Sequence, residues 1–152
     1  MALRERHATG PVRAPSPTIT AMSIADAALI LDNALSAHQQ WRAAIHVAVA
    51  TGKRLEVAPM RQDDGCELGR WLHGEGQAQH RTRPLFTELI HSHQEFHVVA
   101  SVVASILKGK SPEQAVALME GNSKFAASSR ALGIAIMRLK GELQKLPEAD
   151  KF

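Results

Sequence analysis

The sequence predicts an all-α protein, built as a four-helix bundle with one additional short helix that carries the single cysteine. Apolar residues recur three or four positions apart over long stretches, and this spacing puts them on one face of an α-helix. No stretch shows a convincing alternation of apolar and polar residues, which is the pattern of a half-buried strand. Serine, proline and glycine stand where helices typically begin and end. Together these observations favour helices packed around a shared apolar core.

The first helix is expected to begin after Ser23 and to end at Gly52. Ser23 with Asp26 three residues later resembles a capping box, and glycine is a common helix stop. The inward face of this helix takes positions at helical spacing, namely Ala27, Leu31, Ala34, His38, Trp41, Ile45 and Ala48.

Two further helices are expected in the middle of the chain. A polar connection leads to a short helix over residues 65–73, which Gly74 and Gly76 close. A long helix then covers residues 83–108 and ends at Gly109. Its inward stripe consists of Phe86, Ile90, His93, His97, Ala100, Val103 and Leu107.

The last predicted helix begins at Ser111 and extends to about Leu146. Ser111, Pro112 and Gln114 are strong start signals, because they supply an N-cap serine, a proline at the first position and a glutamine at the third. Gly121 lies inside this stretch and is expected to bend the helix.

A chain of 152 residues suits a single domain. We expect the helical domain to cover residues 21–147 and residues 148–152 to form a C-terminal tail. Residues 1–20 are predicted to be a disordered tail, because they hold three prolines and three arginines without apolar periodicity. An alternative is that translation begins at Met22, where the helical pattern starts.

Composition narrows the classes of function. The longest apolar run, residues 98–107, has ten residues and is too short to span a membrane. The net charge is +3, but residues 1–20 carry +2 of it, and no basic stripe or aromatic platform for nucleic acid is seen. The chain lacks the apolar segment of a secretory signal, and one cysteine cannot form an intramolecular disulfide. A cytoplasmic protein without nucleic-acid binding or membrane insertion is therefore expected.

Three of the eight histidines are expected to face the apolar core. His93 and His97 lie four residues apart, so their side chains project from the same helix face, and His38 lies on the inward face of the first helix. A single inward histidine or a single buried cysteine is usually an ordinary core residue. Three imidazoles together with Cys66 are harder to explain separately, because the inward faces offer few polar partners. A shared metal would satisfy them, since three nitrogens and one thiolate form a natural tetrahedral zinc set.

The pair His93 and His97 also invites comparison with zinc proteases. Their H-E-x-x-H motif places a glutamate directly after the first histidine, whereas here that position is Gln94 and Glu95 follows one residue late. Four protein ligands would also leave no position for a catalytic water. We therefore expect no enzymatic activity.

Three short motifs stand in order along the chain: HQQW at 38–41, CELGRW at 66–71 and HQEFH at 93–97. Their residue types and spacing resemble the chemoreceptor zinc-binding domain (CZB) family over about residues 24–140. The resemblance implies a four-helix bundle that pairs as a homodimer. It also implies one zinc ion per chain, bound by His38, Cys66, His93 and His97.

Members of that family are bacterial regulatory proteins that accompany chemoreceptors or diguanylate cyclases, so the resemblance implies a signalling partner of one of these kinds. The sequence shows no signalling coiled coil or catalytic domain, and a stand-alone domain is expected. The leading hypothesis is a zinc-binding sensory or regulatory domain that responds to zinc availability or to oxidants. Two alternatives stay open: a purely structural zinc-stabilised bundle that serves as a dimerisation module, and a metalloenzyme with an exchangeable fourth ligand.

Several residues near the motifs have expected roles under the leading hypothesis. Cys66 is expected to be either the switchable ligand, because oxidants attack thiolates and residues 63–76 should make few core contacts, or an inert structural ligand. Gly69 is expected to let the short helix approach its neighbour closely. Trp41 and Trp71 are expected to wall off the zinc site. The dimer surface is expected to include Val98, Val99 and Val102.

Overall fold

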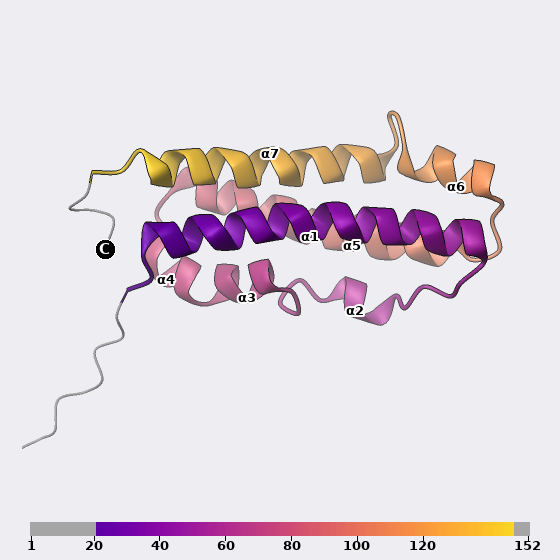
Figure 1. Cartoon of the computed structure of the whole chain (residues 1–152), viewed down its shortest axis with the longest axis horizontal. Coiled ribbons are helices and arrows are strands. Elements are labelled where there is room, and N and C mark those ends of the chain that lie inside the picture. Colours follow the sequence, from indigo (N-terminus) through magenta and orange to yellow (C-terminus); the bar gives the residue numbers. More distant parts are fainter. Residues whose placement is uncertain (1–20, 148–152) are drawn as a thin grey trace, which may run out of the picture.

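The computed structural model describes residues 21–147, and every regular element in this range is an α-helix (Figure 1). Along the chain the helices are α1 (Ile24–Thr51), α2 (Ala58–Arg61), α3 (Glu67–His73), α4 (Glu75–His80), α5 (Pro84–Leu107), α6 (Pro112–Met119) and α7 (Lys124–Gln144). The predicted all-α class is confirmed. The predicted tails, residues 1–20 and 148–152, lie outside the described range.

The long helices α1, α5 and α7 run alongside one another, and α7 packs against both of the others (Figure 1). The short helices α2, α3 and α4 lie in a row along another side, where α2 contacts α5 and α3 contacts α1. Within residues 21–147, no helix has the length and apolar character to cross a membrane. The largest core side chains, all less than 2% exposed, are Phe86, Phe125, Leu31, Ile45, Leu72, Leu89, Met119, Leu132, Ile136, Leu139 and Leu143.

The ends of α1 lie where the sequence predicts them. The hydroxyl of Ser23 accepts the backbone N–H of Asp26 at 3.1 Å, which satisfies a donor that has no partner within the helix. Gly52 ends the helix with a φ of 68°, a left-handed conformation that costs glycine little. The expected inward face is buried, except that His38 and Trp41 are only partly so.

The predicted last helix, residues 111–146, is two helices, and the expected bend at Gly121 is wrong. The capping box predicted at the start of α6 is present, but α6 ends before Gly121, which adopts a φ of 63°. The hydroxyl of Ser123 then accepts the N–H of Ala126 at 3.1 Å and caps α7. A left-handed glycine followed by a capping serine is a helix stop followed by a helix start.

Two short helices lie in segments that were expected to be connections. α2 forms one turn in the polar stretch after α1, with Pro59 near its start. α4 follows α3 directly, although Gly74 and Gly76 were expected to end the helical stretch. Position 76 of α4 has no room for a side chain, because the indole ring of Trp71 packs against it. A Cβ there would lie 2.7 Å from the ring. Three long and four short helices within residues 21–147 therefore take the place of the predicted four main helices and one short one.

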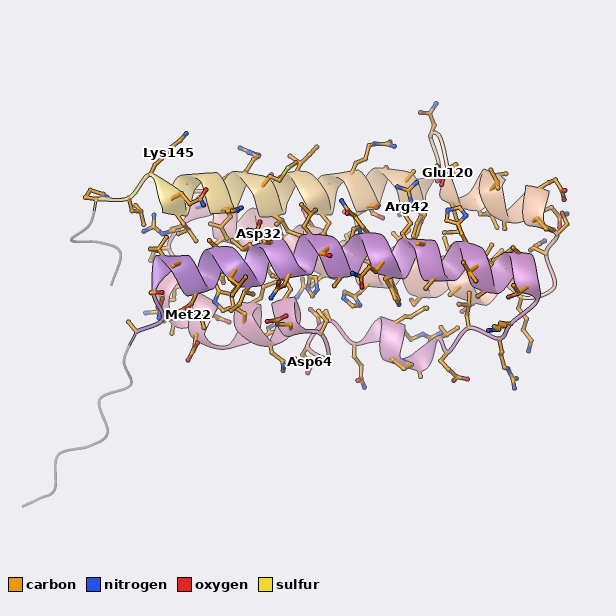
Figure 2. The ribbon with its side chains drawn as sticks, in the orientation of Figure 1. Met22, Asp32, Arg42, Asp64, Glu120 and Lys145 are labelled. Carbon is orange, nitrogen blue, oxygen red and sulfur yellow. The ribbon has the colours of Figure 1, made fainter. Side chains whose placement is uncertain are left out.

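Polar contacts hold α7 against α1. Glu120, between α6 and α7, accepts from one guanidinium nitrogen of Arg42 on α1, with its two oxygens at 2.8 and 2.9 Å (Figure 2). This bond from Arg42 is the main cause that lowers the pKa of Glu120. His46 Nε2 lies 3.0 Å from the same carboxylate. Further along α7, Lys140 donates to Asp32 of α1 at 2.6 Å. These contacts link α1 to the α6–α7 connection on one side of the position of His38 and to α7 on the other.

Candidate metal centre

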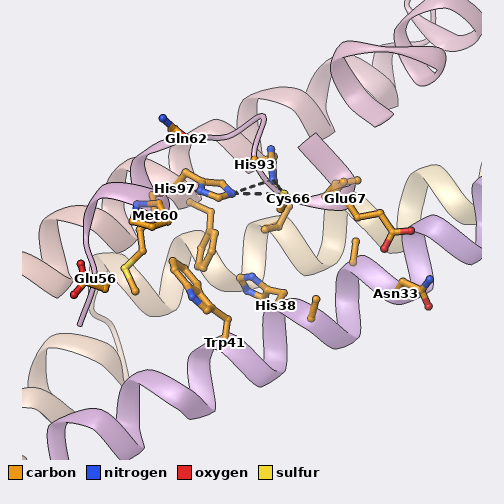
Figure 3. Close-up of a pocket in the computed structure, with 17 residues that line it drawn as sticks. Asn33, His38, Trp41, Glu56, Met60, Gln62, Cys66, Glu67, His93 and His97 are labelled. Atoms are coloured by element: carbon orange, nitrogen blue, oxygen red, sulfur yellow. Dashed lines mark hydrogen bonds between the residues drawn. The ribbon is translucent and has the colours of Figure 1, made fainter. Parts of the chain in front are cut away.

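Cys66, His93 and His97 bring three metal-binding atoms together at one place (Figure 3). The Sγ atom of Cys66 lies 3.2 Å from Nε2 of His93 and 4.0 Å from Nε2 of His97, and the two nitrogens are 3.1 Å apart. A tetrahedral zinc ion, with Zn–N of about 2.0–2.1 Å and Zn–S of about 2.3 Å, requires about 3.3 Å between two nitrogens and about 3.6 Å between nitrogen and sulfur. The three donors are therefore spaced as ligands of one zinc ion.

The two histidines meet because α5 is continuous through both, so that residues four apart share one face. His93 is 2% exposed, and its ring centroid lies 4.5 Å from that of His97. Burial is the main cause that lowers the pKa of His93 to about 4, and the neighbouring His97 contributes. The His93 imidazole is therefore neutral near neutral pH, which is the protonation state that a metal ion requires.

Cys66 approaches the histidines as the residue that caps α3, and not from within a helix as the sequence analysis expected. Its Sγ accepts the backbone N–H of Gly69 at 3.2 Å. Position 69 has no room for a side chain, because a Cβ there would overlap the carbonyl oxygen of Asp63. The close approach predicted at Gly69 is confirmed, but the neighbour is the turn before Cys66. The spacing C-x-x-G therefore has two effects. It places the backbone N–H that Cys66 accepts, and it lets the turn at Asp63 lie directly against α3 at Gly69.

The orientation of His97 depends on a contact that the sequence analysis missed. Its Nδ1 lies 2.8 Å from the carbonyl oxygen of Met60 in α2. A carbonyl oxygen only accepts hydrogen bonds, so Nδ1 carries a proton, and Nε2 is the ring nitrogen that faces the cluster. A residue pattern offers no signal for this contact, because the acceptor is a backbone atom.

His38, the fourth predicted ligand, does not lie with the other three. It faces the same cavity from α1 (Figure 3), but its Nε2 lies 2.8 Å from the hydroxyl of Ser129 on α7. Its ring contacts Phe96 edge-on, with centroids 4.1 Å apart. Burial is the main cause that lowers the pKa of His38 to about 4, and Arg42 and His97 contribute. Its role as a ligand stays a prediction.

A cavity of about 690 Å³ opens beside the three donors. Its walls are largely apolar and include Phe96. Trp41 and Met60 also line it (Figure 3). The expectation for Trp41 is confirmed, because its ring also lies against that of His97, with centroids 6.2 Å apart. Trp71 does not line this cavity, so the expectation for it is wrong. Its ring packs instead against Phe86, at a centroid distance of 5.7 Å.

The segment that carries Cys66 is anchored, although residues 63–76 were expected to make few core contacts. Arg70 donates to the carbonyl oxygen of Gly65 at 2.7 Å and so ties α3 to the turn before it. Residues of α3 that are at most 5% exposed are Leu68, Trp71 and Leu72. Burial of three large side chains is incompatible with a loosely held helix.

Two of the remaining histidines lie away from the three donors in contrasting surroundings. His91 is exposed, as expected from its position two residues before His93 on the same helix. His80 is 4% exposed and packs against the rings of Trp71 and Phe86. Within residues 21–147, neither ring nitrogen of His80 has a hydrogen-bond partner. His80 has no histidine partner at helical spacing, and no sequence signal predicts its burial.

An all-α fold that gathers thiolate and imidazole donors beside one cavity defines a helical metal-binding domain, and these donor types suit zinc. Comparison with protein families gives the particular family that the chain resembles: residues 38–104 match the model of the chemoreceptor zinc-binding domain. The resemblance inferred from the three motifs is confirmed over this range, which is shorter than the expected residues 24–140 and contains all four predicted ligands. The match implies a zinc-binding signalling domain. Searches of the curated proteins and of the solved structures found no match.

Proposed function

We propose that this chain is a non-enzymatic sensory or regulatory zinc domain of a bacterial cytoplasmic signalling system. It binds one zinc ion and passes zinc availability or oxidant exposure to a chemoreceptor or diguanylate cyclase partner. The observation that carries the proposal is the spacing of Cys66, His93 and His97, which matches the ligands of one tetrahedral zinc ion. The family match over residues 38–104 supports the same assignment.

The fourth ligand in this proposal is His38. It lies within the matched segment, faces the cavity beside the other three donors and is neutral near neutral pH because burial lowers its pKa to about 4. A site with four protein ligands has no open position for a catalytic water, which supports a non-enzymatic role.

Zinc titration tests the proposal. The wild-type protein should bind one zinc ion per chain in competition with a chromophoric chelator, and His93→Ala and Cys66→Ser should abolish this site. The matched control is His91→Ala, because His91 lies on the same helix but is exposed, and this variant should bind zinc as the wild type does. Binding that is equally strong in all four proteins would contradict the proposed ligands.

The two alternatives give different results. A purely structural site would stay filled across the range of free zinc found in cells, whereas a sensory site should fill and empty within it. X-ray absorption should show three nitrogens and one sulfur around zinc. A water oxygen in place of one nitrogen would favour a metalloenzyme instead.

The proposed oxidant response acts on Cys66. The thiolate sulfur attacks one oxygen of hydrogen peroxide, the O–O bond breaks and hydroxide leaves, so that a sulfenic acid forms, which is a poorer zinc ligand. Cys66 is partly exposed and lines the cavity, so small oxidants can reach it. Because α3 is anchored, the expected result is zinc release without loss of the helix. Zinc that stays bound while Cys66 becomes oxidised would contradict this response.

A second copy of the chain is the proposed partner for an apolar stripe on α5. Val98, Val102 and Ile106 are 60%, 51% and 44% exposed and lie four residues apart along the helix. Val99, which was expected in the dimer surface, is 6% exposed and belongs to the core. Light scattering should give a dimer for the wild type and a monomer for Val102→Glu. Val47→Glu on α1, where the valine is 57% exposed, should remain dimeric.

A further inference from the structure

Ser129 is the hydrogen-bond partner of His38, and the bond joins α7 to α1. The Oγ atom of Ser129 lies 2.8 Å from Nε2 of His38, and Ser129 is only 7% exposed. Within residues 21–147 the Ser129 hydroxyl has no other hydrogen-bond partner. Its neighbour Ser128 is equally buried, at 5% exposed, but donates to the carbonyl of Phe125 in its own helix at 3.0 Å. The Ser128 hydroxyl therefore has its hydrogen-bond partner within its own helix, whereas the Ser129 hydroxyl depends on His38 for its partner.

We propose that Ser129 competes with zinc for Nε2 of His38, so that completion of the four-ligand site is coupled to α7. The inference rests on the proposed zinc site and adds a role for a residue outside it. Ser129 acts as a positioning residue: it holds His38 apart from the three donors that already converge, Cys66, His93 and His97.

The competition follows from the chemistry of one nitrogen atom. Nε2 of His38 can either share a hydrogen bond with the hydroxyl or give its lone pair to a metal ion, and it cannot do both. When zinc takes Nε2, the buried hydroxyl of Ser129 loses its partner and must turn to a carbonyl of α7, as Ser128 already does. The cavity of about 690 Å³ beside His38 leaves room for the imidazole to move.

The coupling is reciprocal. Zinc binding that releases Ser129 from His38 favours movement of α7 away from α1 by some factor. An event that moves α7 in this way must then raise the zinc affinity by that same factor. α7 packs against both other long helices, so a change at Ser129 is placed where it can alter the packing of the whole domain.

The decisive variant is Ser129→Ala, with Ser128→Ala as the matched control. Loss of the competing bond should tighten zinc binding in a chelator competition by roughly 2- to 12-fold, which corresponds to the net stability of one hydrogen bond. Ser128→Ala should bind zinc as the wild type does, because the Ser128 hydroxyl contacts only its own helix. Zinc affinity that is unchanged or weaker in Ser129→Ala would overturn the proposal.

A second measurement identifies the nitrogen that binds the metal. Nitrogen-15 NMR of the histidine rings should show Nε2 of His38 bonded to Ser129 without zinc and coordinated with zinc. Coordination through Nδ1, with Nε2 still bonded to Ser129, would mean that the serine supports the ligand and would also overturn the proposal. If the wild type binds no zinc, the proposed function fails as well. Zinc binding that is identical in the wild type and Ser129→Ala defeats the competition alone.

Discussion

The backbone carbonyl of Asp63 occupies the space that a side chain at Gly69 would need. We therefore expect Gly69→Ala to push the turn before Cys66 away from α3 and to displace the sulfur from the two imidazoles. The variant should lose most of its zinc affinity and destabilise the fold by about 1–3 kcal/mol, the range for overpacking a close contact. Zinc titration and urea unfolding measure the two effects.

Gly65→Ala is the control for this prediction. A Cβ at position 65 would lie 3.7 Å from the nearest atom, the carbonyl oxygen of Gln62, which is an ordinary contact. This variant should bind zinc as the wild type does. Equal changes in zinc affinity and stability in the two alanine variants would show that the contact between Gly69 and the Asp63 carbonyl is not tight.

Removing zinc is expected to lower the melting temperature. The donors come from α5 and from the cap of α3, and a ligand that binds only the folded state stabilises it by about 2.7 kcal/mol at 100 times its Kd. For a chain of this size that corresponds to a shift of about 5–10 °C. His97→Ala should melt near the chelator-treated wild type and respond little to zinc. A wild-type melt that is identical with zinc and with chelator would refute the four-ligand site.

His80 is expected to make the fold less stable in mild acid. Its burial is the main cause that lowers its pKa, so the unfolded chain, with an ordinary histidine pKa of about 6.5, takes up a proton first. Stability should therefore fall as the pH drops below about 6.5. His80→Leu removes this titration and two unpaired buried nitrogens. It should raise the free energy of unfolding by about 1 kcal/mol above that pH and by more below it.

Urea unfolding at about pH 8 and about pH 5.5, on either side of the ordinary histidine pKa, measures this difference. His91→Leu is the control, because His91 is exposed and should change stability little at either pH. A pH dependence that is the same in His80→Leu and the wild type would contradict the prediction.

Alanine substitutions at two glycines of the last helical stretch should change the free energy of unfolding in opposite directions. Gly121 has a φ of 63°, so Gly121→Ala should destabilise the fold by about 1–2 kcal/mol. Gly141 lies inside α7, and a Cβ at this position would have no neighbouring atom within 4 Å. Gly141→Ala should therefore stabilise the fold by about 0.5–1 kcal/mol. Urea unfolding measures both changes, and if both alanines stabilise, the break between α6 and α7 is absent in solution.

The features that the sequence predicted well depend on spacing within one element. The inward face of α1 and the pairing of His93 with His97 both follow from helical periodicity. The convergence of Cys66 on that pair has no such local signal, and it was inferred from the residue types and the family resemblance.

The features that sequence reasoning missed depend on contacts between elements. The orientation of His97 depends on the Met60 carbonyl, and the position of His38 depends on Ser129 of α7. Neither partner differs in type from many other residues of the chain. Gly76 was read as a helix end because glycine disfavours helices, yet the nearby ring of Trp71 requires a glycine inside α4. At Gly76 the packing against Trp71 therefore outweighs the low helix propensity of glycine.

The Sγ atom of Cys66 has two tasks, since it faces the two imidazoles and also accepts the N–H that starts α3. Alanine at position 66 would remove both interactions, so its effect on stability overstates the contribution of the metal. Serine or aspartate at position 66 can still cap α3 while offering zinc a much poorer donor or a different one. A lineage of this chain could therefore lose the proposed zinc response by a single substitution and keep a folded domain, free to be recruited for another task.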